Sequence, residues 1–310
     1  MVIIGNIFIG GIINMEYLFN NCDIKVKLMN VEEVKDFVKR HGEFAAVCYN
    51  TNKKYALNVG KSVLSDGHFS GSRADYFKFE VTLVPRYTCD QIVRHEQGCI
   101  KNVQSQRYCD LSSFKMYASD IIMQDEELVQ ELENHVKETR ERYLRMKTRL
   151  KEKYPKAKEE WINDQIRTIL PIGCETKLNV AFTVEGLIHF CNVRLCRRAD
   201  KPIQEFAKML KNEVLAVAPI YAPYLVPQCE RDLYCKEKHG CGAYPSKEEL
   251  QKLIQLGKDC CKNEDNQCKG NCLQCNGCKP NDNIIHQPFG DEFYSAKFEP
   301  IEPFDSNKYN

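Results

Sequence analysis

The sequence predicts an α+β domain over residues 15–225, followed by a cysteine-rich C-terminal extension over residues 226–310. Two segments, 76–84 and 176–183, have the pattern of strands, and amphipathic helices precede, separate and follow them. Nine of the 17 cysteines fall between Cys229 and Cys278, where regular patterns give way to Pro, Tyr, Gly and Cys. These observations divide the chain into a folded domain and a tail of different composition.

Each predicted element follows from a local pattern. Segment 76–84 alternates between a polar and an apolar face, and the apolar face consists of Phe77, Phe79, Val81 and Leu83. Pro85 suits the start of a helix over 86–94, because the first backbone N–H groups of a helix have no acceptor within it and a proline there loses no hydrogen bond. Apolar residues at three-, four- and seven-residue steps predict a long charged helix over 125–154. The remaining predicted elements are helices over 31–40, 54–65, 158–169, 184–196 and 202–218, and a strand over 105–111.

Composition excludes several classes of protein. The net charge is +1, with 28% charged and 10% aromatic residues, which indicates no nucleic-acid or acidic-substrate bias. Segment 1–14 is apolar, lacks a basic residue and is too short to cross a bilayer. We expect a first strand there, or an extension upstream of a start at Met15, and no membrane partner. Without a secretory signal, the cysteines are expected to be reduced in a cytoplasmic protein.

Three segments concentrate arginine and histidine beside apolar residues. They are Arg94-His95 with Ser105-Gln106-Arg107-Tyr108, Arg167-Thr168-Ile169-Leu170-Pro171, and His189-Phe190-Cys191-Asn192-Val193-Arg194. A guanidinium group offers a planar fork of donors that matches phosphate oxygens or a pyrimidine edge. Buried pairs with ordinary carboxylates are the alternative for each arginine, and a helix-end cap is the alternative for His95.

In this order and spacing the three segments resemble the flavin-dependent thymidylate synthases (the ThyX family). The resemblance implies a central antiparallel sheet flanked by helices and a homotetramer whose active sites form between subunits. It implies a methyltransferase that converts dUMP to dTMP, with FAD as cofactor and NADPH and methylenetetrahydrofolate as co-substrates. Methylation then proceeds without an enzyme cysteine, because arginines polarise the uracil ring.

The resemblance also assigns residues one by one. The positions that hold dUMP are Gln91, Ser105, Arg107, Arg167 and Arg194. Of these, Arg194 and Ser105 are the expected catalytic residues, and Arg194 polarises the base. Arg94, His95 and His189 are expected to face flavin and folate.

Several positions depart from the family pattern, mostly where flavin is expected. Glu96 and Glu185 replace arginines, Thr183 replaces an asparagine, and Asp200 lies in a stretch that usually reads His-Ala-Gln-x-Glu. The upstream pattern Gly-His-x-Ser-Pro-x-Glu-His reads Gly-His-Phe-Ser-Gly-Ser-Arg-Ala over 67–74, with Arg73 at the usual glutamate. We expect the two glutamates to weaken anion binding and Arg73 and Arg198 to oppose that loss.

These departures leave two alternatives to thymidylate synthesis. One is a different C5 modification of a deoxyuridine nucleotide, such as hydroxymethylation. The other is a non-catalytic nucleotide-binding protein that has lost flavin.

The extension carries a possible metal site. Cys268, Cys272, Cys275 and Cys278 provide four thiols at short spacings, which suits structural zinc and, less well, an iron–sulfur cluster. The alternative is a reduced, flexible, cysteine-rich tail.

Overall fold

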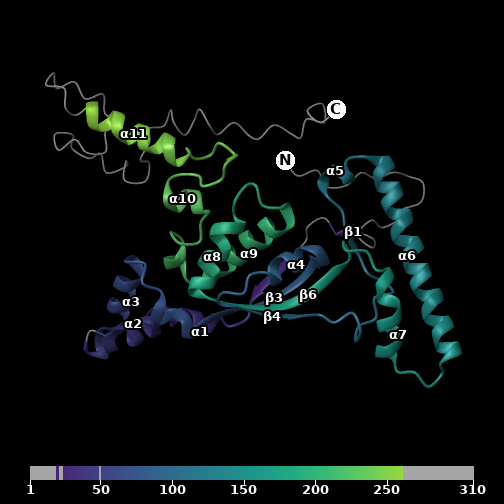
Figure 1. Cartoon of the computed structure of the whole chain (residues 1–310). Coiled ribbons are helices and arrows are strands. Elements are labelled where there is room, and N and C mark those ends of the chain that lie inside the picture. Colours follow the sequence, from purple (N-terminus) through teal and green to yellow (C-terminus); the bar gives the residue numbers. More distant parts are fainter. Residues whose placement is uncertain (1–18, 21–23, 49, 261–310) are drawn as a thin grey trace. The chain divides into compact units, whose positions relative to one another are not determined.

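A computed structural model describes residues 19–20, 24–48 and 50–260 (Figure 1). Contacts divide the chain into two units, Met1–Val226 and Pro227–Asn310, which are described separately. The expected strand in segment 1–14 lies outside the described residues. No helix in the described part of the chain combines the length and the apolar character needed to cross a membrane.

The first unit is built on a four-stranded antiparallel sheet. Its strands lie in the order β2 (Lys25–Leu28), β3 (Tyr76–Pro85), β6 (Glu175–Thr183) and β4 (Cys99–Val103). The two predicted strands 76–84 and 176–183 are therefore confirmed, and they pair as the two central strands. A separate parallel pair joins β1 (Phe19–Asn20) to β5 (Met116–Tyr117).

One detail of the predicted alternation in β3 is wrong. Phe77, Phe79 and Val81 are buried as expected, but Leu83 is only partly buried and Val84 takes its place in the core. The pairing with β6 shifts between Val81 and Val84, and Leu83 adopts a φ of 60°. This irregularity is a β-bulge: an extra residue moves the following side chain to the other face.

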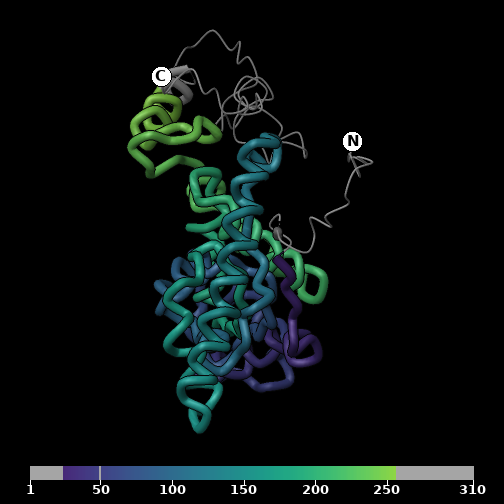
Figure 2. Tube along the Cα trace, turned by 90° about the vertical axis from the view of Figure 1, so that its right-hand side faces the viewer, coloured from purple at the N-terminus to yellow at the C-terminus, as the bar shows by residue number. Residues whose placement is uncertain are grey.

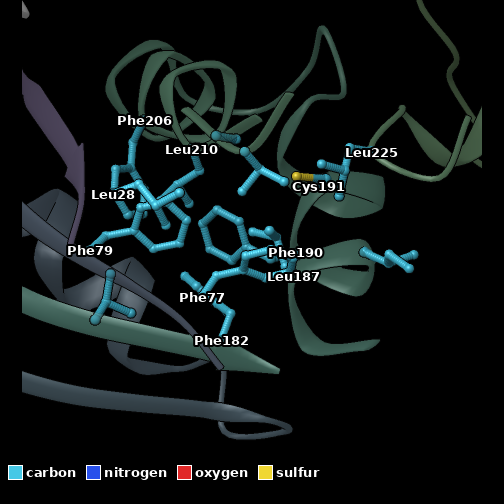
Figure 3. Packing of buried hydrophobic residues seen from close by; sticks show 14 of the residues in the cluster. Leu28, Phe77, Phe79, Phe182, Leu187, Phe190, Cys191, Phe206, Leu210 and Leu225 are labelled. Atoms are coloured by element: carbon cyan, nitrogen blue, oxygen red, sulfur yellow. The ribbon is translucent and has the colours of Figure 1, made fainter. Parts of the chain in front are cut away.

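Helices cover one face of the sheet and bury its aromatic side chains. They are α4 (Arg86–Val93), α8 (Val184–Arg194) and α9 (Lys201–Val217), close to their predicted bounds. Phe190 lies at the centre of this core, with ring centroids 5.1 Å from Phe182 and 5.6 Å from Phe206 (Figure 3). Phe190 is fully buried and lies between His189 and Arg194 in the sequence. Its packing therefore fixes on the sheet the same helix, α8, that carries these two candidate site residues.

The first predicted N-terminal helix is wrong in its bounds, whereas the predicted helix over 54–65 is confirmed. Instead of one helix over 31–40, the chain forms α1 (Val31–Lys35) and α2 (Phe37–Cys48), followed by η2 (Lys53–Tyr55), α3 (Ala56–Ser65) and η3 (Ser70–Ala74). Helices α2 and α3 cross at two glycines, where a Cβ on Gly42 would lie 1.7 Å from the carbonyl oxygen of Ala56. This backbone contact allows α2 to continue beyond residue 40, since its later turns pack against α3.

A second, smaller core lies under a helical hairpin. The long helix α6 (Glu126–Lys153) follows the short α5 (Asp120–Met123) and packs against α7 (Glu159–Ile166), which continues as η4 (Arg167–Ile169) (Figure 2). The side-chain carboxylate of Asp125 caps α6 by accepting from Glu127 N at 3.0 Å and Leu128 N at 3.1 Å. The predicted helix 125–154 is thus confirmed.

Two further predictions are corrected. Residues 105–111 form turns and loop, and the strand in this region is β4, which ends at Val103, before the predicted strand begins. The Oγ atom of Ser105 accepts from Arg107 N at 3.2 Å, a local turn that competes with strand pairing. In the region after residue 220, where we expected no regular element, the structure has α10 (Gln228–Asp232) and α11 (Lys247–Cys260) in the second unit.

Candidate active site

Two of the predicted arginines meet at one carboxylate. Arg107 Nε lies 3.4 Å from Asp164 Oδ1, and Arg167 Nη2 lies 3.0 Å from the same atom. We call Ser105, Arg107, Asp164 and Arg167 the Arg107 cluster. Each guanidinium has five N–H donors, so a contact to one carboxylate oxygen leaves donors available to a bound phosphate or base.

Buried polar residues fix this cluster to the helical hairpin. Asn163 is buried, and its Nδ2 donates to the carbonyl oxygens of Arg107 at 3.0 Å and Cys109 at 3.5 Å. The hydroxyl of the buried Tyr143 donates to Asn163 Oδ1 at 3.4 Å. The turn that carries Ser105 and Arg107 is therefore tied to α6 and α7 by side chains that sequence reasoning missed.

Asp164 was also missed, although one signal was present. It lies three residues before Arg167, and side chains three apart on a helix are neighbours. The second contact, to Arg107, joins positions 57 residues apart and has no local signature. Asp164 brings the two arginines together, and this is the carboxylate pairing that we gave as the alternative to a ligand role; their role in binding stays a prediction.

Replacing Asn163 by alanine should loosen the Arg107 cluster. The carbonyl oxygens of Arg107 and Cys109 would lose their donor, which costs about 1–3 kcal/mol in the free energy of unfolding. We also expect weaker binding of dUMP, the ligand that the resemblance implies, because the turn that carries Ser105 and Arg107 is no longer fixed. Calorimetric titration and urea melts measure both effects. Gln165→Ala, an exposed position on the same helix, is the control, and equal behaviour of the two variants would contradict this role.

A second group of site residues surrounds Arg194. Its Nε donates to His95 Nε2 at 2.9 Å, and the His95 ring lies 6.2 Å from that of His189 and 4.7 Å from that of Phe190. Arg94, which ends α4, lies close enough to lower the pKa of Arg194. We call Arg94, His95, His189 and Arg194 the Arg194 cluster.

The Arg194 cluster is electrostatically suited to an anion. Burial, with the positive charge of Arg194 and further contributions from His189 and Lys101, lowers the pKa of His95 to about 4. Burial and then the charge of Arg94 lower the pKa of Arg194. The neighbours that lower the pKa values of His95 and Arg194 are thus arginine, lysine and histidine side chains. Partly buried like charges of this kind are stabilised by a negatively charged ligand.

The lowered pKa of His95 predicts a specific pH dependence. The folded state binds a proton at His95 less readily than the unfolded state, so this residue destabilises the fold as pH falls from about 6.5 towards 4. At neutral pH the imidazole is uncharged, and its Nε2 accepts from Arg194. In NMR titrations we expect Arg194→Gln to raise the pKa of His95, but not fully to 6.5, because burial remains. A wild-type value at or above 6.5 would contradict this assignment.

The two clusters lie at opposite ends of the sheet. Glu175, where β6 starts, follows η4 and the Arg107 cluster, whereas Thr183 at its other end bonds Gly98 beside the Arg194 cluster. A nine-residue strand spans about 30 Å. Figure 1 shows α7 beyond one end of β3 and β6, and α8 near their other end. Arg107 and Arg167 are thus associated with one end of β6, and Arg194 with the other.

Gln91 belongs with the Arg194 cluster by position. It lies on α4, and its Nε2 donates to Asp200 Oδ2 at 3.5 Å. Of the predicted nucleotide residues, Ser105, Arg107 and Arg167 thus lie at one end of the sheet, and Gln91 and Arg194 at the other.

The altered flavin positions are partly compensated. Arg73 Nε lies 2.7 Å from Glu185 Oε2, so the carboxylate of Glu185 is paired with a cation. Thr183 caps α8, with its Oγ1 accepting from Gly186 N at 3.0 Å. The donors Arg94, His95 and His189 near a neutralised Glu185 fit the negatively charged pyrophosphate of FAD.

Two cysteines near the motifs, Cys99 and Cys174, are not poised for nucleophilic attack. Burial raises the pKa of Cys99 and of Cys174 to about 11, so neither thiol ionises at neutral pH. Among the described residues no group of three or more His, Cys, Asp or Glu is arranged to hold a metal. Cys268, Cys272, Cys275 and Cys278 lie outside the described residues, and their zinc site stays a prediction.

An antiparallel sheet covered by helices, with two clusters of arginine and histidine side chains, defines an α+β protein, and comparison with known proteins specifies the family. The family model described as thymidylate synthase complementing protein (Thy1) matches residues 31–220. The chain belongs to this family.

Relatives with curated names agree with this family. A flavin-dependent thymidylate synthase of Nitratidesulfovibrio vulgaris is 28% identical over 61% of this chain and 77% of its own length. The protein of the same name from Pyrococcus furiosus is 31% identical over 57% of this chain and 71% of its own length. Among solved structures, the UMP/dUMP methylase PolB from Streptomyces cacaoi bound with 5-Br dUMP is 16% identical, with a TM-score of 0.49 over 67% of this chain and 99% of that chain.

Proposed function

We propose that the protein is a flavin-dependent thymidylate synthase that methylates dUMP at C5 to give dTMP. The observation that carries this proposal is the pair of cationic clusters, each assembled from the segments that the family motifs occupy. The curated relatives, which carry the same name, support the assignment.

The active site is proposed to form between subunits of a homotetramer. The Arg107 cluster lies towards the Glu175 end of β6, and the Arg194 cluster lies towards its Thr183 end. A symmetric oligomer brings different surfaces of identical chains together, so the Arg107 cluster of one subunit can meet the Arg194 cluster of another.

In such a site the residues divide the work. Ser105, Arg107 and Arg167 hold the phosphate and sugar of dUMP through charge-assisted hydrogen bonds. Arg194 points at the uracil ring and polarises it, which raises electron density at C5 without a covalent bond to the enzyme. Neutral His95 accepts from Arg194 Nε and fixes the orientation of that guanidinium.

The cofactor is proposed to bind beside the Arg194 cluster. Arg94, His95 and His189 would hold FAD, and bound FAD would supply the redox chemistry that links NADPH and methylenetetrahydrofolate to the new methyl group. The protein positions these partners and excludes a competing cysteine nucleophile, since Cys99 stays protonated.

An assay of the full-length protein tests this function. We expect flavin absorbance in the purified protein, or after FAD is added, and conversion of dUMP to dTMP with methylenetetrahydrofolate and NADPH. The product mass separates methylation from hydroxymethylation. Binding of dUMP without FAD binding or turnover would instead indicate a non-catalytic nucleotide-binding protein and overturn the proposal.

A further inference from the structure

An ion pair joins two segments that are far apart in the sequence. Arg73 in η3 and Glu185 in the first turn of α8 are 112 positions apart. Arg73 Nε donates to Glu185 Oε2 at 2.7 Å and Arg73 Nη2 to Glu185 Oε1 at 3.4 Å. Two parallel contacts of this kind fix the orientation of both side chains, which a single lysine contact does not.

Both members of this pair are inverted in charge relative to the family pattern. The pattern has a glutamate where this chain has Arg73 and an arginine where it has Glu185. Either inversion alone would place two like charges in contact, at a cost from Coulomb repulsion. In this chain the two residues form an attractive pair.

The position of Glu185 makes its neutralisation relevant to binding. Glu185 and His189 are four residues apart on α8, so their side chains lie on neighbouring turns of one face. The same helix ends at Arg194. An unpaired carboxylate at residue 185 would oppose an anionic ligand at the Arg194 cluster, and the guanidinium of Arg73 removes that opposition.

We infer that Arg73 is a positioning residue for the flavin part of the site, an inference that rests on the proposed function. Arg73 clamps η3 to α8 and masks the charge of Glu185.

A charge-exchange series tests the inference. We expect Arg73→Glu and Glu185→Arg, made separately, each to weaken FAD binding, Arg73→Glu by about tenfold because two carboxylates then adjoin. The double variant Arg73→Glu/Glu185→Arg should bind FAD within about threefold of the wild type, since it restores an attractive pair. Flavin fluorescence titration of the intact protein gives the affinities.

Controls separate this effect from general damage. Arg145→Glu reverses one charge of an exposed pair with Glu141 on α6 and should leave FAD affinity unchanged. Arg73→Gln, which introduces no repulsion, covers the case in which Arg73→Glu does not fold. If the wild type binds FAD and Arg73→Glu binds it equally well, or the double variant is as weak as the single ones, the inference is wrong. If the wild type binds no FAD, the result contradicts the proposed flavin-dependent function itself, and not only the role of Arg73.

Discussion

Mixed assemblies of two inactive variants should recover activity. Arg107→Ala and Arg194→Ala each remove a charge-assisted contact to dUMP, and each is expected to lower kcat/KM roughly a hundredfold. When the two subunits are co-expressed and assemble at random, about one quarter of the sites should combine an intact Arg107 cluster with an intact Arg194 cluster. The specific activity of the mixture is then expected to approach one quarter of the wild-type value.

The matched control uses two variants of the same cluster. Co-expressed Arg107→Ala and Arg167→Ala leave no subunit with an intact Arg107 cluster, so no recovery is expected. Activity in this control equal to that of the first mixture would contradict a site divided between subunits. Absence of recovery in both mixtures, with assembly verified by native mass spectrometry, would do the same.

Truncating Phe190 to alanine should cause a large loss of stability. This ring is fully buried, and its neighbours at 5.1 and 5.6 Å are the rings of Phe182 and Phe206. Removing a buried phenylalanine side chain and leaving a cavity costs about 3–5 kcal/mol in the free energy of unfolding. Denaturant melts at a fixed protein concentration measure this loss, since assembly makes stability concentration-dependent.

Phe190 also connects the core to the site. Its ring packs edge-on against His95 at 4.7 Å, so the cavity admits water beside the imidazole. The pKa of His95 should rise towards its ordinary value, because burial is the main cause of its shift. Val47→Ala, an exposed position on α2, is the comparison and should change stability by no more than about 0.5 kcal/mol. A loss below about 1 kcal/mol for Phe190→Ala would show that the core does not depend on this ring.

Much of the fold was visible in the sequence because its signals are local. The alternation from Phe77 to Val81 identified a central strand, and the apolar steps along α6 identified the longest helix. The errors arose where a local signal was absent. The bulge at Leu83 adds one residue to β3 and leaves no sign in the composition of the segment. The turn at Ser105 depends on the hydrogen bond from Arg107 N to the Ser105 hydroxyl, which takes the place of strand pairing.

The sequence by itself singled out Arg107, Arg167 and Arg194 as candidate site residues, because they stand in motifs whose order and spacing are specific. Only the tertiary structure decided how they are grouped. Asp164 joins Arg107 to Arg167, β6 separates both from Arg194, and Arg73 neutralises Glu185 across 112 positions. Periodicity reports which face of a segment is buried, whereas the partner of a charged side chain depends on how distant segments pair and pack.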